Sequence, residues 1–142
     1  MKKTSIVLLV SILMVVVFSA CTSQPTPQPV TGTDRDIILA YSESQTNNLL
    51  SGLNANNYTQ FSRDFDDAML NSVNQAAFTT LDTQIIGTYG KYISRETQGV
   101  QTLAGLVRVV YQGKFEKDDN IIILVVFHPD GDHKITGLFF TK

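Results

Sequence analysis

The chain of 142 residues contains one cysteine, Cys21, and this limits how the folded protein can be stabilised. A disulfide within the chain cannot form, so stability must come from side-chain packing. Residues 1–20, which precede the cysteine, consist largely of an apolar run from Ile6 to Phe18, interrupted only by Ser11. The roughly 120 residues that follow have room for one domain, which buries over about 60% of its unfolded-chain surface. We therefore expect a single domain with a core that needs no covalent staple.

The residues before Cys21 have the order of a secretory signal peptide. Lysines at positions 2 and 3 form a basic start, the apolar run follows, and small residues at 19 and 20 lead into the cysteine. A run of about 13 apolar residues suits a signal, whereas a membrane span needs about 20. The segment resembles the lipobox of bacterial-type lipoproteins, with Phe18 where an aliphatic residue is usual. The resemblance implies cleavage before Cys21, lipidation of its thiol, and a lipid-anchored location on the extracytoplasmic face of the cell membrane.

The charge balance excludes one class of partner. Residues 1–20 hold two lysines and no acid, so the remaining chain carries nine basic and 13 acidic residues. Proteins that bind nucleic acids gather Lys and Arg on one face, and polybasic membrane surfaces need similar clusters. We therefore expect no nucleic-acid partner, and we expect contact with the membrane through the lipid anchor.

Residues 21–35 are predicted to form a tether behind the anchor. Pro25, Pro27 and Pro29 alternate with polar residues there, a pattern that favours extended polyproline-II geometry. At about 3.1 Å per residue, a dozen residues would reach about 40 Å. The sequence is thus divided into a signal peptide (1–20), the lipidated cysteine with its proline-rich tether (21–35), and a folded domain (36–142).

Three helices are predicted in the first half of the domain, over about residues 34–53, 58–65 and 74–89. Apolar side chains recur there at helical spacing. Thr33 or Asp34 is the expected N-cap of the first helix and Asn74 that of the third, while Gly87 and Gly90 mark the end of the third.

Four strands are predicted in the second half. Tyr92–Gln101 is polar, as an edge strand would be, and residues 103–116 alternate between apolar and polar. Ile121–Phe127 is apolar on both faces, which predicts a central strand, and Ile135–Thr141 closes the sheet. The order predicts an α+β domain with N-terminal helices packed on a curved four-stranded antiparallel sheet.

Two stretches carry a family resemblance. Leu50 to Tyr58, followed by Phe61 and by Phe65 to Met69, and the C-terminal hairpin from Asp130 to Phe140 resemble the nuclear-transport-factor-two-like superfamily. More narrowly, they are similar to a domain-of-unknown-function family found alone on surface lipoproteins or preceding α/β-hydrolase domains. The resemblance covers Ser44 to Lys142 and implies a cone-like sheet around a pocket. Ketosteroid-isomerase-like members hold an acid-base residue in that pocket, but no residue here matches that constellation.

Two polar clusters are candidates for chemistry. His128 and His133 flank a Pro-Asp-Gly-Asp turn, and imidazole with carboxylate suits zinc or manganese. The favoured interpretation is a polar hairpin tip, because such a turn needs Asp and Gly for its backbone angles. Asp64, Asp66 and Asp67 could act in acid-base catalysis or bind a cation, but acids between helices also cap helix starts. We predict no metal, no cofactor and no catalytic residue.

Tyrosines are the candidates for a ligand pocket. Their rings can line a cavity and their hydroxyls can donate hydrogen bonds, although tyrosines at core spacing more often bury the ring and leave the hydroxyl at the rim. The candidate pocket residues are Tyr41, Tyr58, Tyr89 and Tyr111.

These observations favour a membrane-anchored lipoprotein whose extracytoplasmic domain is a non-enzymatic binding or interaction module. A small hydrophobic ligand and a protein are both candidate partners. The alternative is a small enzyme of the ketosteroid-isomerase-like or hydrolytic type that uses carboxylates and tyrosines of the cone pocket. Convergence of ionisable groups with perturbed pKa values in that pocket would favour the enzyme.

Overall fold

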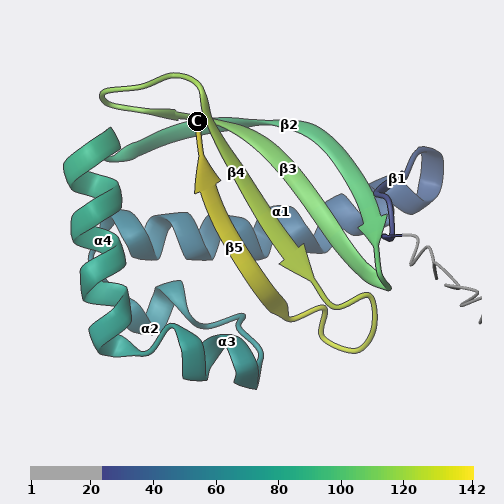
Figure 1. Cartoon of the computed structure of the whole chain (residues 1–142), viewed down its shortest axis with the longest axis horizontal. Helices are drawn as coiled ribbons and strands as arrows, with labels where there is room; N and C mark the ends of the chain where they lie inside the picture. Colours follow the sequence, from purple (N-terminus) through teal and green to yellow (C-terminus); the bar gives the residue numbers. More distant parts are fainter. Residues whose placement is uncertain (1–23) are drawn as a thin grey trace, which may run out of the picture.

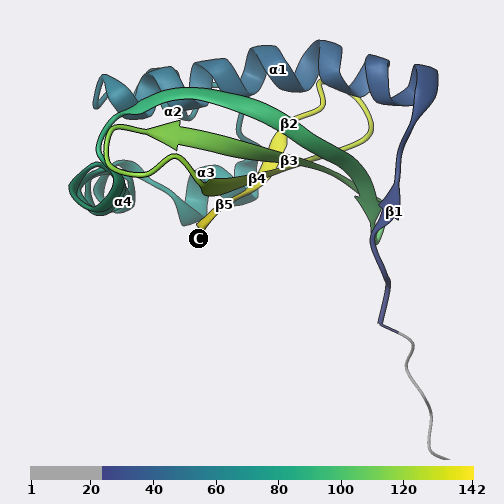
Figure 2. The ribbon, with the colours of Figure 1, turned by 90° about the horizontal axis from the view of Figure 1, so that it is seen from above.

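A long helix, α1 (Gly32–Asn54), crosses one face of an antiparallel sheet in the computed structural model, which describes residues 24–142 (Figure 2). Helices packed against an open sheet make an α+β fold, as predicted. The sheet has five strands, however, and the prediction of four is wrong. The strands follow the order of the chain: β1 (Gln28–Pro29), β2 (Tyr92–Leu103), β3 (Leu106–Phe115), β4 (Ile121–Phe127) and β5 (Ile135–Thr141).

The strand that the sequence does not predict is β1, which comes from the proline-rich stretch assigned to the tether. Gln28 pairs with Thr102 of β2 and Pro29 pairs with Gln101. The N–H of Val30 also donates to the carbonyl of Val100 at 2.8 Å. Proline is tolerated at this position because an edge strand does not need every N–H for pairing.

The entry into α1 differs from the expected one. The helix begins at Gly32 behind Thr31, whose side chain makes no capping hydrogen bond, so the predicted N-cap at Thr33 or Asp34 is wrong. Because β1 fixes the chain at Val30, the turn into the helix is completed before those polar residues are reached. Among the helices of residues 24–142, none has the length and apolar character needed to cross a membrane.

The segment between the two longer helices contains two short helices, α2 (Tyr58–Phe61) and α3 (Asp67–Ser72), so the single helix predicted over 58–65 is wrong. Phe65 instead forms an isolated parallel bridge with Ile135. The N–H of Ile135 donates to the carbonyl of Asp64 at 2.8 Å, and the N–H of Asp66 donates back to Ile135 at 3.0 Å. The sheet edge thus holds these residues extended and prevents one continuous helix.

Helix α4 (Gln75–Tyr89) has the predicted start. The Oδ1 atom of Asn74 accepts hydrogen bonds from the N–H groups of Ala76 and Ala77, both at 3.1 Å. Figure 1 shows α4 at one end of the sheet, beyond the ends of the strands, with α2 and α3 beside it.

The core lies between α1 and the sheet. Alternate residues of β3 and β4 face the helix, and Val109, Tyr111, Ile123 and Val125 are 0% exposed. They meet Leu49, Leu50 and Leu53 of α1 in one hydrophobic cluster. Since β4 pairs with β3 on one side and β5 on the other, the predicted central position of Ile121–Phe127 is confirmed.

Candidate functional site

The sheet face opposite α1 carries an apolar groove of about 380 Å³. In Figure 1 this face is turned toward the viewer, with α1 behind the sheet. The residues that line the groove come from four strands and one turn: Leu103, Ala104, Leu106, Arg108, Leu124, Val126 and Phe139. We call this set the apolar groove.

The register of the sheet brings these side chains together. Arg108 of β3 pairs with Val126 of β4, and Leu124 of β4 pairs with Phe139 of β5. Side chains alternate between the two faces of a strand, so these positions point away from α1 while their neighbours fill the core. Phe139 is 57% exposed, which leaves a large aromatic ring facing solvent at the edge of the groove.

The turn between β2 and β3 forms one end of the groove. The predicted continuous strand over 103–116 is wrong, because Ala104 (φ 50°) and Gly105 (φ 81°) both lie in the left-handed region and close a two-residue hairpin. Such turns favour Asn-Gly, and alanine in this conformation costs about 1 kcal/mol. We call Leu103–Leu106 the hairpin tip; it is an unusually apolar sequence, Leu-Ala-Gly-Leu, for an exposed turn.

Arg108 is the one charged residue among those lining the groove. Within residues 24–142, no carboxylate lies within ion-pair distance of its guanidinium group. A cation beside apolar walls can orient an amphiphile, with the anionic group at the guanidinium and the chain along the leucines.

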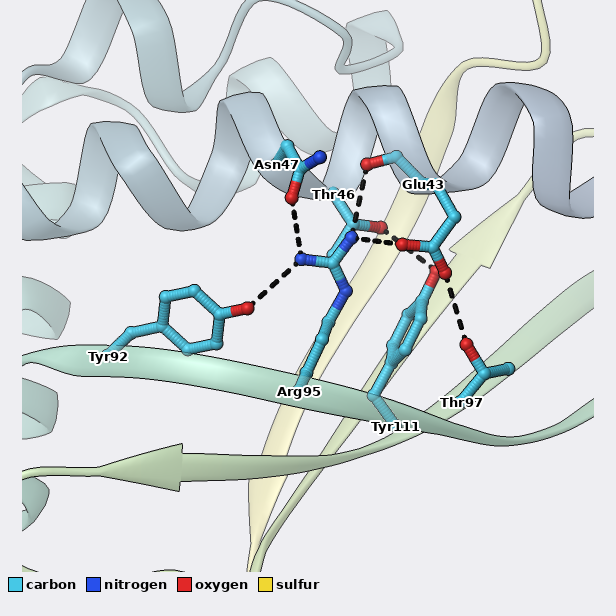
Figure 3. A network of polar contacts seen from close by, with 7 residues as sticks. All are labelled: Glu43, Thr46, Asn47, Tyr92, Arg95, Thr97 and Tyr111. Atoms are coloured by element: carbon cyan, nitrogen blue, oxygen red, sulfur yellow. Dashed lines mark hydrogen bonds and ion pairs between the residues drawn. The ribbon is translucent and has the colours of Figure 1, made fainter.

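The most extensive polar cluster in the domain lies between α1 and β2, not in the groove. Figure 3 shows the guanidinium group of Arg95 pointing from β2 toward α1. It donates to Asn47 Oδ1 at 2.8 Å, to Tyr92 Oη at 3.1 Å and to Glu43 Oε2 at 2.5 Å. Glu43 Oε1 also accepts from the Thr97 hydroxyl at 3.1 Å. These bonds fasten α1 to β2.

The environment of Arg95 keeps its charge in place. The side chain is only 6% exposed, and burial by itself would lower its pKa. The hydrogen bond with Tyr92 and the Glu43 carboxylate outweigh that effect, and the pKa is raised. Its guanidinium carbon lies 4.9 Å from the centre of the Tyr111 ring, a cation–π contact. The cluster therefore has the character of a structural tie, because its cation is enclosed by protein.

The four tyrosines predicted for a pocket are spread through the domain. Tyr111 is 0% exposed, with its hydroxyl 3.4 Å from Thr46 Oγ1, and burial raises its pKa. Tyr58 packs on Phe78 and Tyr89 on Phe115, with ring centres 5.6 and 6.0 Å apart. The fourth is Tyr41, which borders a separate shallow pocket.

That shallow pocket, of about 200 Å³, lies between the start of α1 and the β4–β5 turn. Tyr41 stacks on His133 there, with ring centres 3.9 Å apart and planes 9° apart. Burial, followed by the nearby Tyr111, raises the pKa of Tyr41. His133 has a buried Nδ1 atom without a hydrogen-bond partner among the residues that the structure describes.

The two histidines that flank the turn point to different partners. While His133 stacks on Tyr41, the Nε2 atom of His128 lies 2.9 Å from Asp66 Oδ2. In the described part of the chain, no group of three or more His, Cys, Asp or Glu residues could hold a metal ion. The backbone N–H of His128 donates to the carbonyl of Lys134 at 2.9 Å. This bond across the turn is consistent with a turn-forming role for the segment.

The three aspartates near Phe65 have structural partners. Asp66 is the N-cap of α3 and accepts from the N–H of Met69 at 2.7 Å, which confirms the capping interpretation for this residue. Burial would raise its pKa, but hydrogen bonds from Met69, Thr136 and His128 hold it below the ordinary value. Asp64 accepts from Asn48 Nδ2 at 2.8 Å, and Asp67 lies in the first turn of α3.

Cys21, the predicted lipidation site, lies outside the described residues. The apolar groove is absent from the sequence-based prediction, although two signals point to it: the apolar hairpin tip, and the outward positions Leu124, Val126 and Phe139. Apolar residues on both faces of β4 predict a central strand, but they fit equally well a strand with one face left uncovered.

Comparison with known proteins identifies a family. No protein of curated function matches the chain, and no solved structure matches it. The model of the family described as "Protein of unknown function (DUF3887)" matches residues 46–138, which run from the middle of α1 to β5. Because this match covers more than half of the chain, the protein belongs to the DUF3887 family.

Proposed function

We propose that the protein is a lipid-anchored, extracytoplasmic binding module that is attached to the membrane through Cys21 and binds an apolar partner on the apolar groove. The observation that carries the binding role is the groove itself. It is lined by five aliphatic residues, one aromatic residue and one arginine, on a sheet face that α1 does not cover.

The size and exposure of the groove support a binding role. Its volume of about 380 Å³ lies within the range of about 300–1,000 Å³ that small-molecule sites occupy. Grouped exposed apolar side chains are the surfaces that proteins use for partners or membranes. Phe139 at 57% exposure would gain the most from being covered.

A non-enzymatic role is supported by the chemistry of the lining residues. A catalytic site brings titratable groups together around a place where a substrate could react. The groove contributes the guanidinium group of Arg108 and otherwise aliphatic or aromatic side chains. Such a surface can hold and orient a ligand, but it offers no general base or nucleophile to it.

The proposal includes the nuclear-transport-factor-two-like superfamily as the origin of the fold. A long helix crosses the inner side of a curved sheet, and β2 bends along its length in Figure 2. The corner after α1 also supports it: Asn57 caps α2 by accepting from the N–H of Gln60 at 3.1 Å, and Tyr58 begins that helix.

Anchoring is tested by detergent-phase partitioning of the wild type beside Cys21→Ala. Two acyl chains hold a protein stably at about 0.8 kcal/mol per buried methylene, so the wild type should enter the detergent phase. Wild type that stays in the aqueous phase together with the variant would exclude the anchor.

Binding is tested with a fluorescent fatty acid titrated into the protein. We expect saturable binding, weakened about tenfold by Phe139→Asp, because burial of one large apolar side chain contributes about 1.5 kcal/mol or more. The matched control is Ile93→Asp, since Ile93 is 54% exposed and lies at the other end of β2. Equal weakening by both variants would show that the groove is not the binding surface.

A further inference from the structure

We propose that the apolar groove and the hairpin tip rest on the membrane leaflet that carries the anchor, with their side chains in contact with its acyl chains. This inference depends on the proposed anchoring through Cys21 and names the partner of the proposed binding surface.

The path of the chain places the hairpin tip near the proposed anchor. β1 pairs with β2 at Thr102, the residue immediately before the hairpin tip. Six residues lie between Cys21 and Gln28, and the seven residue-to-residue steps span at most about 25 Å when the chain is fully extended. A domain anchored at Cys21 therefore holds its hairpin tip close to the lipid surface.

The chain also leaves the domain in a direction that favours this orientation. Figure 2 shows the purple segment before β1 running away from α1, toward the side of the sheet that α1 leaves uncovered. The hairpin tip lies beside β1 at this same end of the molecule, and α4 lies at the opposite end. An anchor reached along this path turns the uncovered face, and not α1, toward the membrane.

The uncovered face of the sheet is divided into an apolar end and a polar end. The end near β1 holds the apolar groove. The other end holds a second, polar hollow of about 160 Å³, whose lining includes Ser94, Glu96, Gln112, Lys114 and Asp119. Lys114 and Asp119 pair there at 3.3 Å with both side chains more than half exposed. A face that is apolar only beside the anchor suits a tilted domain, with one end in lipid and the other in water.

The backbone conformation of the hairpin tip also favours contact with lipid. Ala104 adopts the left-handed conformation at an exposed turn position where asparagine is the favoured residue. In water, asparagine would stabilise this turn more than alanine does, but its amide group would be unfavourable in contact with acyl chains. Alanine at this position is therefore explained by a lipid environment.

A lipid surface fits the groove better than a second copy of the chain does. A stable protein interface buries about 800 Å² and about 20–30 residues on each partner, whereas the groove involves seven residues. An anchored domain needs little affinity, because a short linker gives effective concentrations of the order of millimolar. A few shallowly inserted side chains are then enough to fix the orientation.

The experiment uses the absence of tryptophan from the chain. Phe139→Trp provides a single tryptophan, which lies in the groove and can be excited selectively over the tyrosines, and Ile93→Trp is the matched control at similar exposure and at the far end of β2. Each mature, lipidated variant is reconstituted into vesicles of phosphatidylethanolamine and phosphatidylglycerol with brominated acyl chains. Side chains at interfacial depth, about 5–10 Å into the headgroup and acyl boundary, are within reach of the bromines.

We expect the bromines to quench at least about half of the fluorescence of Phe139→Trp and to leave that of Ile93→Trp nearly unchanged. Equal fluorescence in brominated and ordinary vesicles for Phe139→Trp would overturn the inference, as would equal quenching of both variants. A doubled molar mass with Phe139→Trp shielded but not quenched would assign the groove to a second copy and also overturn it.

A second variant separates lipid contact from folding. Ala104→Asn should raise the thermal unfolding temperature and reduce the quenching of Phe139→Trp in the double variant, because it relieves the turn and places an amide at the lipid surface. Unchanged quenching would count against the inference. Failure of the proposed anchoring is distinguishable from failure of the inference about the groove, because without an anchor the wild type would be found neither in the detergent phase nor on the vesicles.

Discussion

Gln28 pairs with Thr102, one residue before the hairpin tip, and this pairing connects the side of the chain that would carry the proposed anchor to the apolar end of the sheet. The three backbone contacts of residues 28–30 with β2 fix where the chain enters the domain. Without β1, the tether would meet the domain only at α1, and the orientation of the sheet relative to an anchor would be undefined.

Gly52 is a position where the fold allows no side chain. A Cβ added there would lie 2.4 Å from the backbone N of Phe61, because α1 and α2 pass in close contact. We expect Gly52→Ala to lower the free energy of unfolding by about 1–3 kcal/mol through overpacking. Urea denaturation followed by circular dichroism measures the change.

Gly87 in α4 provides the matched control, since a Cβ there would meet nothing within 4 Å. Gly87→Ala should raise the free energy of unfolding by about 0.5 kcal/mol, as alanine restricts the unfolded chain. Equal effects of the two substitutions would show that the α1–α2 contact is looser than described.

Arg95 should contribute far more to stability than an exposed ion pair. Arg95→Met leaves Glu43, Asn47 and Tyr92 without their guanidinium partner, so we expect a loss of about 2–3 kcal/mol in the free energy of unfolding. Lys114→Met breaks a pair whose side chains are 51% and 63% exposed and should cost less than about 0.5 kcal/mol. Losses of similar size would contradict the role of Arg95 as a tie between α1 and β2.

Asp82 should make stability depend on pH. It is 9% exposed in α4, its Oδ1 atom has no hydrogen-bond partner among the described residues, and burial raises its pKa above 3.8. A raised pKa means that the carboxyl group contributes stability below the ordinary pKa, and that this contribution is lost as the pH rises through the folded-state value.

Asp82→Asn should therefore raise the free energy of unfolding at neutral pH by about 0.5–1 kcal/mol. The difference in the free energy of unfolding between the variant and the wild type should disappear as the pH falls below 3.8, because the Asp82 carboxyl group is then protonated and neutral. Chemical denaturation across this range checks the prediction, and a difference that persists at low pH would refute charge burial as its cause.

The core strands and the capped helix could be predicted from sequence because their signals are local. Period-2 alternation identified β3, the apolar run identified β4, and Asn74 identified the start of α4. β1 could not be predicted, because Gln28 and Pro29 pair through backbone atoms and carry no strand-like side-chain pattern. The pairing of Phe65 with Ile135 could not be predicted either, because it joins residues 70 positions apart, and the local spacing around Phe65 favours a helix.

The candidate site was harder to predict for a related reason. Tyrosine spacing suggested a pocket, but Tyr111 is in the core and its partner Thr46 comes from a distant helix. The groove depends on the pairing of Leu124 with Phe139 and on a sheet face that α1 does not cover. Neither can be predicted from the sequence pattern of a single strand.

The most direct test of the proposed lipid anchor at Cys21 is the mass of the N-terminal peptide of the mature protein, isolated from membranes of the producing cell. We expect a mature chain that begins at Cys21 and carries a diacylglyceryl group on the sulfur of this residue. The corresponding peptide of Cys21→Ala should lack the added mass. An unmodified Cys21 thiol in the mature protein, or a chain that begins after Cys21, would contradict the anchor and the membrane-facing groove that depends on it.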